Sequence, residues 1–267
     1  MSANPRPAPS VTRSLHRAVG LLRLLASHTR IGWRLSDLAE QSGLDPGTVH
    51  RLLGSLCDDG LVTRVPGSRH YTLGTLAFEL GLAAAPYFDL GRLAQAQLAA
   101  AAEQLRGTLF LKMSSGMGSV CLARHDGVGL VPSLMLDVGG RRPLCLTAGG
   151  VAMLIQLPPA QQKEIEAHNR RTITRQDAAR WQGVCQMLAR SRLFGCALNL
   201  CDIAAGITAI GVPVLSDSGA PVVSVTLARS GATMSESAAL AVATRLRDEA
   251  AALQPLLAQL RFQAQPG

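Results

Sequence analysis

Residues 35–53, LSDLAEQSGLDPGTVHRLL, contain two short helical patterns with a turn between them. Ser36 has the chemistry of an N-cap for the first pattern, which ends at Gly43 because glycine readily adopts the left-handed conformation that closes a helix. Asp45 is expected to cap the second pattern, with a proline in the first helical position, where its missing N–H costs nothing. The second helix then runs to about Asp59. This order predicts a helix, a tight turn and another helix.

The second of these helices has two chemically distinct faces. Its apolar stripe consists of Val49, Leu52, Leu53 and Leu56. The opposite face is small or polar apart from one arginine, and it carries Gly47, Thr48, Arg51 and Ser55. Small residues permit close approach to the DNA major groove, and arginine donates hydrogen bonds to phosphate or to a guanine edge. A helix over residues 13–28 precedes them, with one apolar face formed by Leu15, Val19, Leu22 and Ala26. The whole segment predicts a helix-turn-helix.

A β-hairpin is expected directly after the second helix. Residues 61–65 and 70–73 are β-prone, and the turn residues PGSR at 66–69 join them. Such a hairpin is a wing, from which Arg64 and Arg69 can reach the DNA backbone or the minor groove. We therefore predict a winged helix-turn-helix over residues 12–74 that binds double-stranded DNA through Arg34, Ser36, Gly47, Thr48, His50, Arg51, Ser55, Arg64 and Arg69.

Two simpler interpretations of this segment stay open. The three helices can form a small cap whose arginines are merely solvated, and Arg51 can be held by Asp45 or Asp58 in a structural ion pair. Net charge does not decide between them. The 267 residues carry a formal net charge of +8, which permits a polyanionic partner and equally fits an ordinary basic protein.

The stretch at residues 35–53 resembles the N-terminal domain of IclR-type bacterial transcriptional regulators, as do DGLV at 59–62 and YTLG at 71–74. Two later stretches resemble the effector domain of that family, RPLCLTAGG at 142–150 and GITAIGVPV at 206–214. The resemblance covers nearly the whole chain. It implies a regulator that senses a small aromatic or organic acid and acts as a homodimer or homotetramer on a near-palindromic operator, with a GAF-like second domain.

The chain departs from the family pattern at three places. Pro46 and Gly47 stand where family members usually carry a lysine or serine before the threonine of the recognition helix. Cys145 stands where a histidine usually follows Pro-Leu, and Gly149-Gly150 replaces a common Gly-Lys. The first departure bears on base contacts, and the other two predict a pocket with its own chemistry.

Secondary-structure patterns divide the chain into four segments. We expect a flexible tail over residues 1–11, the winged helix-turn-helix over 12–74, a linker helix over 75–88 and an effector-binding and oligomerisation domain over 89–263. The linker helix should end at Ala84, before Pro86, and it can pair with its twin in a dimer or simply pack on its own chain.

The last segment alternates strands and helices in an order that predicts an α+β domain, with an antiparallel sheet covered by helices. Strands are expected at 108–113, 119–124, 130–136, 207–215 and 221–228. Helices are expected at 89–106, 148–157, 159–169, 175–194 and about 239–260.

A helix start at residues 147–150 is the candidate ligand site. Thr147 has N-cap chemistry, and the small residues after it leave N–H groups open to a carboxylate at the positive end of the helix dipole. Arg141 and Arg142 can supply charge nearby. Equally, the glycines can serve close packing alone and the arginines can lie on the surface. With positions implied by the resemblance, the predicted effector-binding residues are Met113, Arg142, Thr147, Ala148, Gly149, Cys201, Asp202, Ser224 and Thr226.

Several classes of protein are not expected. No run approaches 18 apolar residues, so no membrane span is predicted, and the six cysteines form no zinc-like pattern and suit buried thiols of a cytoplasmic protein. A ligand-lining or redox role is the alternative for them. No G-x-S-x-G elbow or HExxH cluster is present, so we predict no catalytic residues, no metal site and no cofactor. Two rival functions are a DNA-binding architectural protein without a ligand and an enzyme that carries a DNA-binding domain.

Overall fold

The computed structural model of the chain describes residues 10–27, 32–128, 137–231 and 234–259. The chain divides into two units, Met1–Ala85 and Pro86–Gly267, and helix α4 (Thr75–Phe88) crosses the boundary between them.

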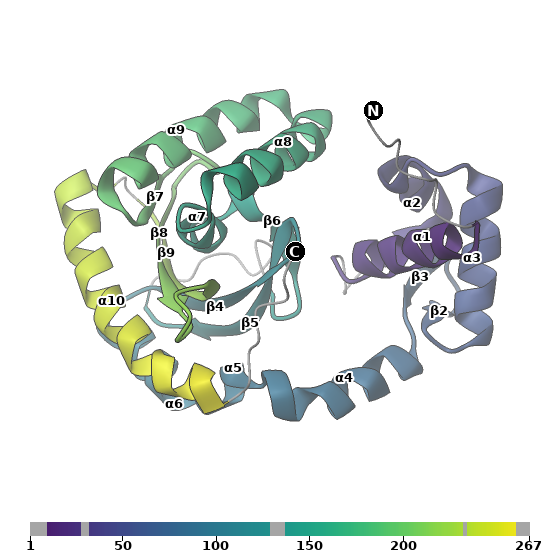
Figure 1. The fold of residues 1–267 in the computed structure, drawn as a ribbon, viewed down its shortest axis with the longest axis horizontal. Helices are drawn as coiled ribbons and strands as arrows, with labels where there is room; N and C mark the ends of the chain where they lie inside the picture. Colours follow the sequence, from purple (N-terminus) through teal and green to yellow (C-terminus); the bar gives the residue numbers. More distant parts are fainter. Residues whose placement is uncertain (1–9, 28–31, 129–136, 232–233, 260–267) are drawn as a thin grey trace, which may run out of the picture. The chain divides into compact units, whose positions relative to one another are not determined.

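The first unit is a winged helix-turn-helix, as predicted (Figure 1). Its elements before α4 are α1 (Ser10–Leu25), β1 (Trp33–Arg34), α2 (Leu35–Ser42), α3 (Pro46–Asp58), β2 (Val62–Arg64) and β3 (His70–Leu73). Strand β3 pairs antiparallel with both β1 and β2. Leu21 and Leu25 of α1, Leu38 of α2 and Val49 and Leu53 of α3 form its buried core. Each such side chain stabilises the fold by roughly 1.5–3 kcal/mol when it leaves water, so this core holds the three helices together.

The start of α2 differs from the expectation. The helix begins at Leu35, and Arg34 occupies the N-cap position without a side-chain hydrogen bond to the helix. Ser36 is therefore not the cap, and its hydroxyl donates instead to Asp37 at 2.9 Å. The short strand β1, which no periodicity reveals, pairs Trp33 and Arg34 with β3 and fixes where the helix can begin.

Helix α1 buries a different face from the expected one. Leu15 and Val19 are exposed, whereas Leu21 and Leu25 lie fully inside the core. The helix has leucine or valine on several sides, so periodicity alone allows more than one inward face, and packing against α2 and α3 selects between them.

Helix α4 carries exposed apolar side chains. Phe78, Leu80 and Leu82 are each more than half exposed. The helix also continues through Pro86, so the expected end before that proline is wrong. A proline in the last turn removes a single amide hydrogen bond, and this end of the helix tolerates that loss.

The second unit contains a six-stranded antiparallel sheet in the order β6-β5-β4-β9-β8-β7. Its strands are β4 (Thr108–Ser115), β5 (Gly118–Asp126), β6 (Arg141–Pro143), β7 (Ala197–Leu200), β8 (Ile207–Leu215) and β9 (Pro221–Ser230). Its helices are α5 (Leu90–Leu93), α6 (Gln95–Gln104), the 3₁₀ helix η2 (Leu144–Leu146), α7 (Ala148–Leu154), α8 (Pro159–Gln176), α9 (Ala178–Phe194) and α10 (Glu236–Gln259). The predicted α+β architecture is confirmed.

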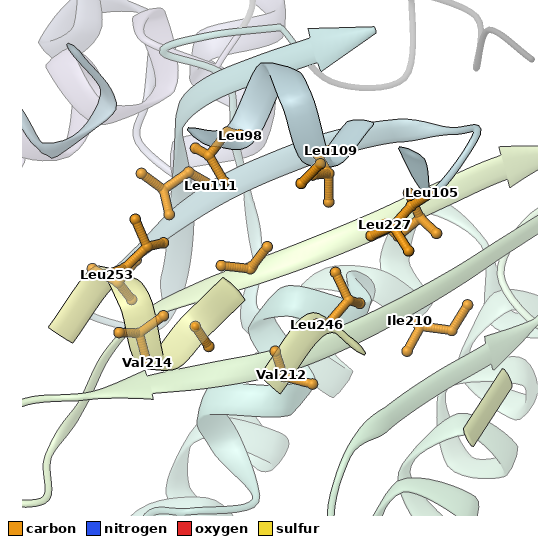
Figure 2. Packing of buried hydrophobic residues seen from close by; sticks show 14 of the residues in the cluster. Leu98, Leu105, Leu109, Leu111, Ile210, Val212, Val214, Leu227, Leu246 and Leu253 are labelled. Atoms are coloured by element: carbon orange, nitrogen blue, oxygen red, sulfur yellow. The ribbon is translucent and has the colours of Figure 1, made fainter. Parts of the chain in front are cut away.

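Helices cover both faces of the sheet (Figure 1). Helices α5, α6 and α10 pack on one face, and η2, α7, α8 and α9 pack on the other. Figure 2 shows the first interface, where Leu109, Leu111 and Leu227 from the sheet lie among Leu98 of α6 and Leu246 of α10. The second face holds the residues that form the cavity described below.

Several boundaries in this unit differ from the expectation. The predicted helix over residues 89–106 is two helices, because Asp89 caps a separate short helix, α5, before α6 begins. Helix α8 extends to Gln176, and Asp177 then caps α9. Strands β6 and β7 are too short to stand out in the sequence. The strand expected over 130–136 lies outside the described residues.

Candidate functional site

Helix α3 begins with a charged cap. Asp45 Oδ1 accepts a hydrogen bond from the Thr48 N–H at 2.8 Å, which confirms the predicted N-cap. Hydrogen bonds from Thr48 hold the pKa of Asp45 below its usual range, so the carboxylate is ionised at neutral pH. The cap fixes the first turn of the helix and with it the position of Gly47.

The face of α3 opposite the core presents four of the predicted DNA contacts. Gly47, Arg51 and Ser55 are exposed, and Thr48 is half-buried. Arg51 Nη2 donates to Thr48 Oγ1 at 3.4 Å. In the described part of the chain no carboxylate lies within ion-pair distance of Arg51, although its charge helps to lower the pKa of Asp45.

A groove between the wing and the start of α2 brings together the other five predicted contacts. It has a volume of about 750 Å³ and is lined by Arg34, Leu35, Ser36, His50, Arg64, Ser68, Arg69, His70 and Tyr71. Three lining residues are arginines and none is acidic, which suits a phosphate backbone. The Arg64 guanidinium lies 5.9 Å from the ring centroid of Tyr71, so the ring supports this cation on the wing. His50 belongs to α3 and joins the groove to the exposed helix face.

The second unit contains a cavity of about 270 Å³ on the α7 side of the sheet. Its wall consists of Phe110, Lys112, Arg142, Leu146, Thr147, Ala148, Arg180, Asn199, Ile203, Ala204, Ile207, Ala209, Thr226 and Ala228. Three of these residues are cationic, none is acidic, and most of the rest are apolar. Such a wall suits a small organic anion with an apolar body.

Lys112 is the most deeply enclosed of the three cations. It is 4% exposed, and burial together with the nearby Arg142 lowers its pKa to about 8. Its cross-strand partner Cys121 is a neutral thiol, because burial raises the pKa of that thiol to about 11. Lys112 Nζ lies 5.6 Å from the Phe110 ring centroid, and it has no ion-pair partner within the described ranges. Its desolvation is therefore offset by little more than a cation–π contact.

Arg142 and Arg180 add to the positive charge of the wall. Arg142 is half-buried, and burial together with the charge of Arg180 lowers its pKa. Arg180 is exposed and forms an ion pair with Asp177 at 3.4 Å. Since the cations repel one another, an anion that binds among them gains from all three.

The start of α7 lies in close contact with the sheet and with η2. Thr147 Oγ1 accepts a hydrogen bond from the Gly150 N–H at 3.1 Å, which confirms this cap. A Cβ on Gly149 would lie 2.5 Å from Thr226 Oγ1 and 2.7 Å from Ser224 Oγ. A Cβ on Gly150 would lie 2.1 Å from a backbone carbonyl oxygen of η2. Both glycines are needed for packing, and the hydroxyls of Ser224 and Thr226 are buried with no hydrogen-bond partner among the described residues.

Asp202 anchors the loop after β7. Its buried carboxylate accepts hydrogen bonds from Arg190 Nη1 at 2.8 Å and from the Leu200 N–H at 2.9 Å. Asn199 Oδ1 accepts from the N–H groups of Asp202 and Ile203. Since Ile203 lines the cavity, Asp202 shapes the wall without forming part of it.

The cavity contains four of the nine predicted effector residues, Arg142, Thr147, Ala148 and Thr226. The other five do not line it. Gly149 and Ser224 are buried in the contact between α7 and β9, and Asp202 is engaged by Arg190. Cys201 has a left-handed backbone with φ of 68° and lies beside Thr208, with 3.8 Å between Sγ and Oγ1. Met113 lies near the end of β4, where it pairs with Val120 and Val223.

Sequence reasoning missed Phe110, Lys112 and Arg180. For the first two a signal exists, because alternation along β4 sends residues 110 and 112 to the face opposite Leu109 and Leu111. A lysine at an inward position between apolar neighbours is rare enough to mark a site. Arg180 carries no such local signal, since only the fold brings α9 to the cavity.

The described residues also bear on whether the chain holds a metal site or reactive cysteines. No group of three or more His, Cys, Asp or Glu side chains in them is placed to hold a metal ion. The six cysteines are free thiols, and burial raises the pKa of Cys145 to about 12. Among the helices that the structure describes, none is long and apolar enough to cross a membrane.

Known proteins match both units. The profile of the IclR helix-turn-helix domain matches residues 14–66, and that of the bacterial transcriptional regulator IclR C-terminal domain matches residues 83–254. The chain is 32% identical over 212 residues to the glycerol operon regulatory protein of Streptomyces griseus, covering 76% of this chain and 78% of that protein. It is 25% identical over 220 residues to the DNA-binding transcriptional repressor YiaJ of Escherichia coli K12, covering 81% and 78%.

Solved structures share the fold at low sequence identity. A putative IclR transcriptional regulator from Silicibacter sp. TM1040 superposes with a TM-score of 0.72 at 22% identity, covering 95% of this chain and 98% of that one. An IclR homologue from Microbacterium hydrocarbonoxydans, solved in complex with 4-hydroxybenzoate, gives a TM-score of 0.61 at 18% identity, covering 92% and 99%.

Proposed function

Because the chain belongs to the IclR family of transcriptional regulators, we propose that it is a ligand-responsive regulator whose second unit binds a small organic acid and whose first unit binds operator DNA. The observation that carries the ligand part of this proposal is the cavity wall, which includes Lys112, Arg142 and Arg180 and no carboxylate. A wall that includes three cationic side chains and no carboxylate favours an anionic ligand.

An aromatic acid is the favoured ligand class. The wall combines the Phe110 ring with aliphatic side chains, which suit an apolar body, and its cations suit a carboxylate. The homologue from Microbacterium hydrocarbonoxydans was solved with 4-hydroxybenzoate, a ligand of this class. For the present chain we take 4-hydroxybenzoate as a probe of the class.

Calorimetric titration of the full-length protein tests the ligand proposal. We expect 4-hydroxybenzoate to bind and the neutral 4-hydroxybenzamide to bind at least roughly tenfold more weakly, since a charged hydrogen bond contributes about 1.5–3 kcal/mol. Arg142→Ala should weaken binding of the acid by a similar factor, whereas Arg171→Ala, an exposed arginine on α8, should not change it. If a panel of aromatic and aliphatic carboxylates produces no binding, the ligand proposal fails and a ligand-independent DNA-binding protein is favoured.

For DNA binding we propose that two copies present their α3 helices to major grooves one helical turn apart, roughly 34 Å, or a multiple of it, on a near-palindromic operator. The exposed face of α3 and the cationic groove beside the wing support this arrangement. Arg51→Ala should weaken operator binding by about 1–3 kcal/mol, measured by fluorescence anisotropy with Arg171→Ala as the control. Unchanged affinity would remove Arg51 from the interface.

A second copy of the chain is the proposed partner of the exposed apolar residues on α4. Phe78, Leu80 and Leu82 would each expose a large side chain on an isolated chain, which is costly in water. Phe78→Glu combined with Leu82→Glu should shift sedimentation toward the monomer. A double variant that sediments like the wild-type protein would contradict a dimer through α4.

Ligand binding must act through a difference in affinity between arrangements of the two DNA-binding units. A ligand shifts an equilibrium only by that difference, so occupancy of the cavity should change operator affinity by a measurable factor. The same anisotropy titration with and without 4-hydroxybenzoate measures it.

A further inference from the structure

The chain contains only two lysines, and they occupy opposite environments. Lys163 lies exposed on α8, whereas Lys112 is almost fully buried and forms part of the cavity wall. All other cationic side chains except the histidines are arginines, which do not lose their proton in proteins. The cavity therefore holds one amine that can lose its proton, whereas its two arginines cannot.

Burial and the nearby cation Arg142 lower the pKa of Lys112 and so favour its neutral amine. The ring of Phe110 and the thiol of Cys121 favour the charged form, but they do not restore the ordinary pKa. With a pKa of about 8, roughly a quarter of the Lys112 side chains are unprotonated at pH 7.5. For an exposed lysine with its ordinary pKa, the unprotonated share is roughly one in a thousand. A desolvated lysine near another cation is the arrangement that activates an amine as a nucleophile.

We propose that Lys112 is a reactive amine, and that the cavity takes carboxylates that also carry an aldehyde or ketone group and holds them as a reversible imine on Lys112 Nζ. This inference rests on the proposed function, because it assumes that the carboxylate binds among the cations of the same cavity. Arg142 and Arg180 would bind the carboxylate and so present the carbonyl group to Lys112.

The bond changes balance without any further reagent. The lone pair of Nζ attacks the carbonyl carbon, the carbonyl π electrons move to the oxygen, and a proton passes from nitrogen to that oxygen to give a carbinolamine. The C–O bond then breaks, and the hydroxyl leaves as water with the remaining amine proton, so that a C=N bond is left. Addition of water reverses the sequence and frees the ligand.

Thr226 is placed to assist the carbinolamine. Its hydroxyl is buried without a hydrogen-bond partner in the described part of the chain, and the residue lines the cavity. Thr226 pairs across the sheet with Phe110, and Ser224, two residues before it, pairs with Lys112. The Thr226 hydroxyl can therefore donate a hydrogen bond to the oxygen that receives charge during the attack.

Reductive trapping on the full-length protein tests the proposal. The protein is incubated with 4-formylbenzoate and cyanoborohydride, which reduces an imine to a stable amine, and the adduct is located by peptide mass spectrometry. We expect one adduct per chain on Lys112, at least roughly tenfold faster than on Lys163 or the N-terminal amine, at a rate that rises from pH 7 to pH 9. Benzaldehyde, which lacks the carboxylate, should label Lys112 at least tenfold more slowly.

Three variants separate the reactive amine from a merely cationic one. Lys112→Met should fold, since methionine suits a buried site, and should lose the adduct, while Lys163→Met should keep it. Lys112→Arg should still bind 4-formylbenzoate in calorimetry and should form no adduct. Equal labelling of Lys112 and Lys163 would overturn the proposal.

The remaining outcomes distinguish this inference from the proposed function. If 4-formylbenzoate binds the wild-type protein and reduction leaves Lys112 unmodified, the imine is excluded and the carboxylate-binding function stands. If neither 4-formylbenzoate nor any other carboxylate binds, both proposals fail together.

Discussion

Helices α3 and α7 begin with the same local chemistry and are used in opposite ways. In each, a side-chain oxygen accepts a hydrogen bond from the N–H of the third helical residue, Asp45 from Thr48 at 2.8 Å and Thr147 from Gly150 at 3.1 Å. Helix α3 keeps one face exposed, whereas every residue of α7 is buried. One helix start therefore stands in solvent beside the proposed DNA-contact residues, and the other forms part of a cavity wall. Packing, and not the cap, decides which use a helix start acquires.

The glycines in the first turns of α3 and α7 give the largest expected difference in stability. A Cβ on Gly150 would lie 2.1 Å from the Leu144 carbonyl oxygen, so Gly150→Ala forces backbone apart and should lower the free energy of unfolding by roughly 3 kcal/mol. A Cβ on Gly47 would meet only Asp45 Oδ1, at 3.3 Å, so Gly47→Ala should leave stability unchanged or raise it by up to about 1 kcal/mol. Urea denaturation measures both. Equal loss of stability in the two variants would contradict the contrast.

The contrast between the α3 face and the cavity beside α7 also explains which site residues the sequence could predict. The cap, turn and stripe of α3 are local features, so Asp45, Gly47 and Arg51 were within reach of sequence reasoning. The wall of the cavity combines strands, a loop and helices that are distant in the chain, and Arg180 reaches it only because α9 packs over β7. Asp202 is an example of a wrong prediction. A polar residue near a sheet edge is a reasonable candidate for a ligand contact, yet its carboxylate accepts a hydrogen bond from Arg190 instead.

The predictions for the start of α2 and the buried face of α1 were wrong because tertiary contacts outweighed local chemistry there. Ser36 is a good capping residue, yet the pairing of β1 with β3 starts α2 at Leu35. The leucines and valines of α1 permit several inward faces, and the core selects Leu21 and Leu25 instead of Leu15 and Val19. These positions could be predicted only with the packing partners known.

The buried cation supplies the next contrast, between Lys112 in the cavity wall and Lys163 on the surface. Because the pKa of Lys112 falls from 10.5 in the unfolded chain to about 8 in the folded one, its burial costs about 3 kcal/mol at pH 7. Lys112→Met should therefore raise the free energy of unfolding by about that amount at pH 7. Lys163→Met, at an exposed position, should change it by less than about 0.5 kcal/mol.

The pH dependence of the same variant has a definite sign. Between pH 8 and pH 10.5 the unfolded chain holds the Lys112 proton and the folded chain does not, so the wild-type protein gains stability as pH rises through this range. The advantage of Lys112→Met over the wild type should accordingly shrink from pH 7 to pH 9.5 in urea denaturation. An advantage that stays constant across this range would show that Lys112 titrates normally in the folded protein.

The smallest expected effect separates the two parts of the proposed DNA-contact surface, the face of α3 and the wing. Arg69 lines the wing groove with Arg34 and Arg64, and a contact from there to the phosphate backbone carries no sequence information. Arg69→Ala should thus weaken binding by less than about 1 kcal/mol, equally for operator and unrelated duplex, and should reduce the slope of log affinity against log salt by about 1. Arg51→Ala should instead reduce the ratio of the affinity for the operator to that for unrelated duplex, because the Arg51 side chain lies on the face expected to meet base edges. Anisotropy titrations at several salt concentrations with both duplexes distinguish the two. If Arg69→Ala reduced the preference for the operator as strongly as Arg51→Ala, the wing would also read sequence, and the division between a base-contacting helix and a phosphate-contacting wing would be wrong.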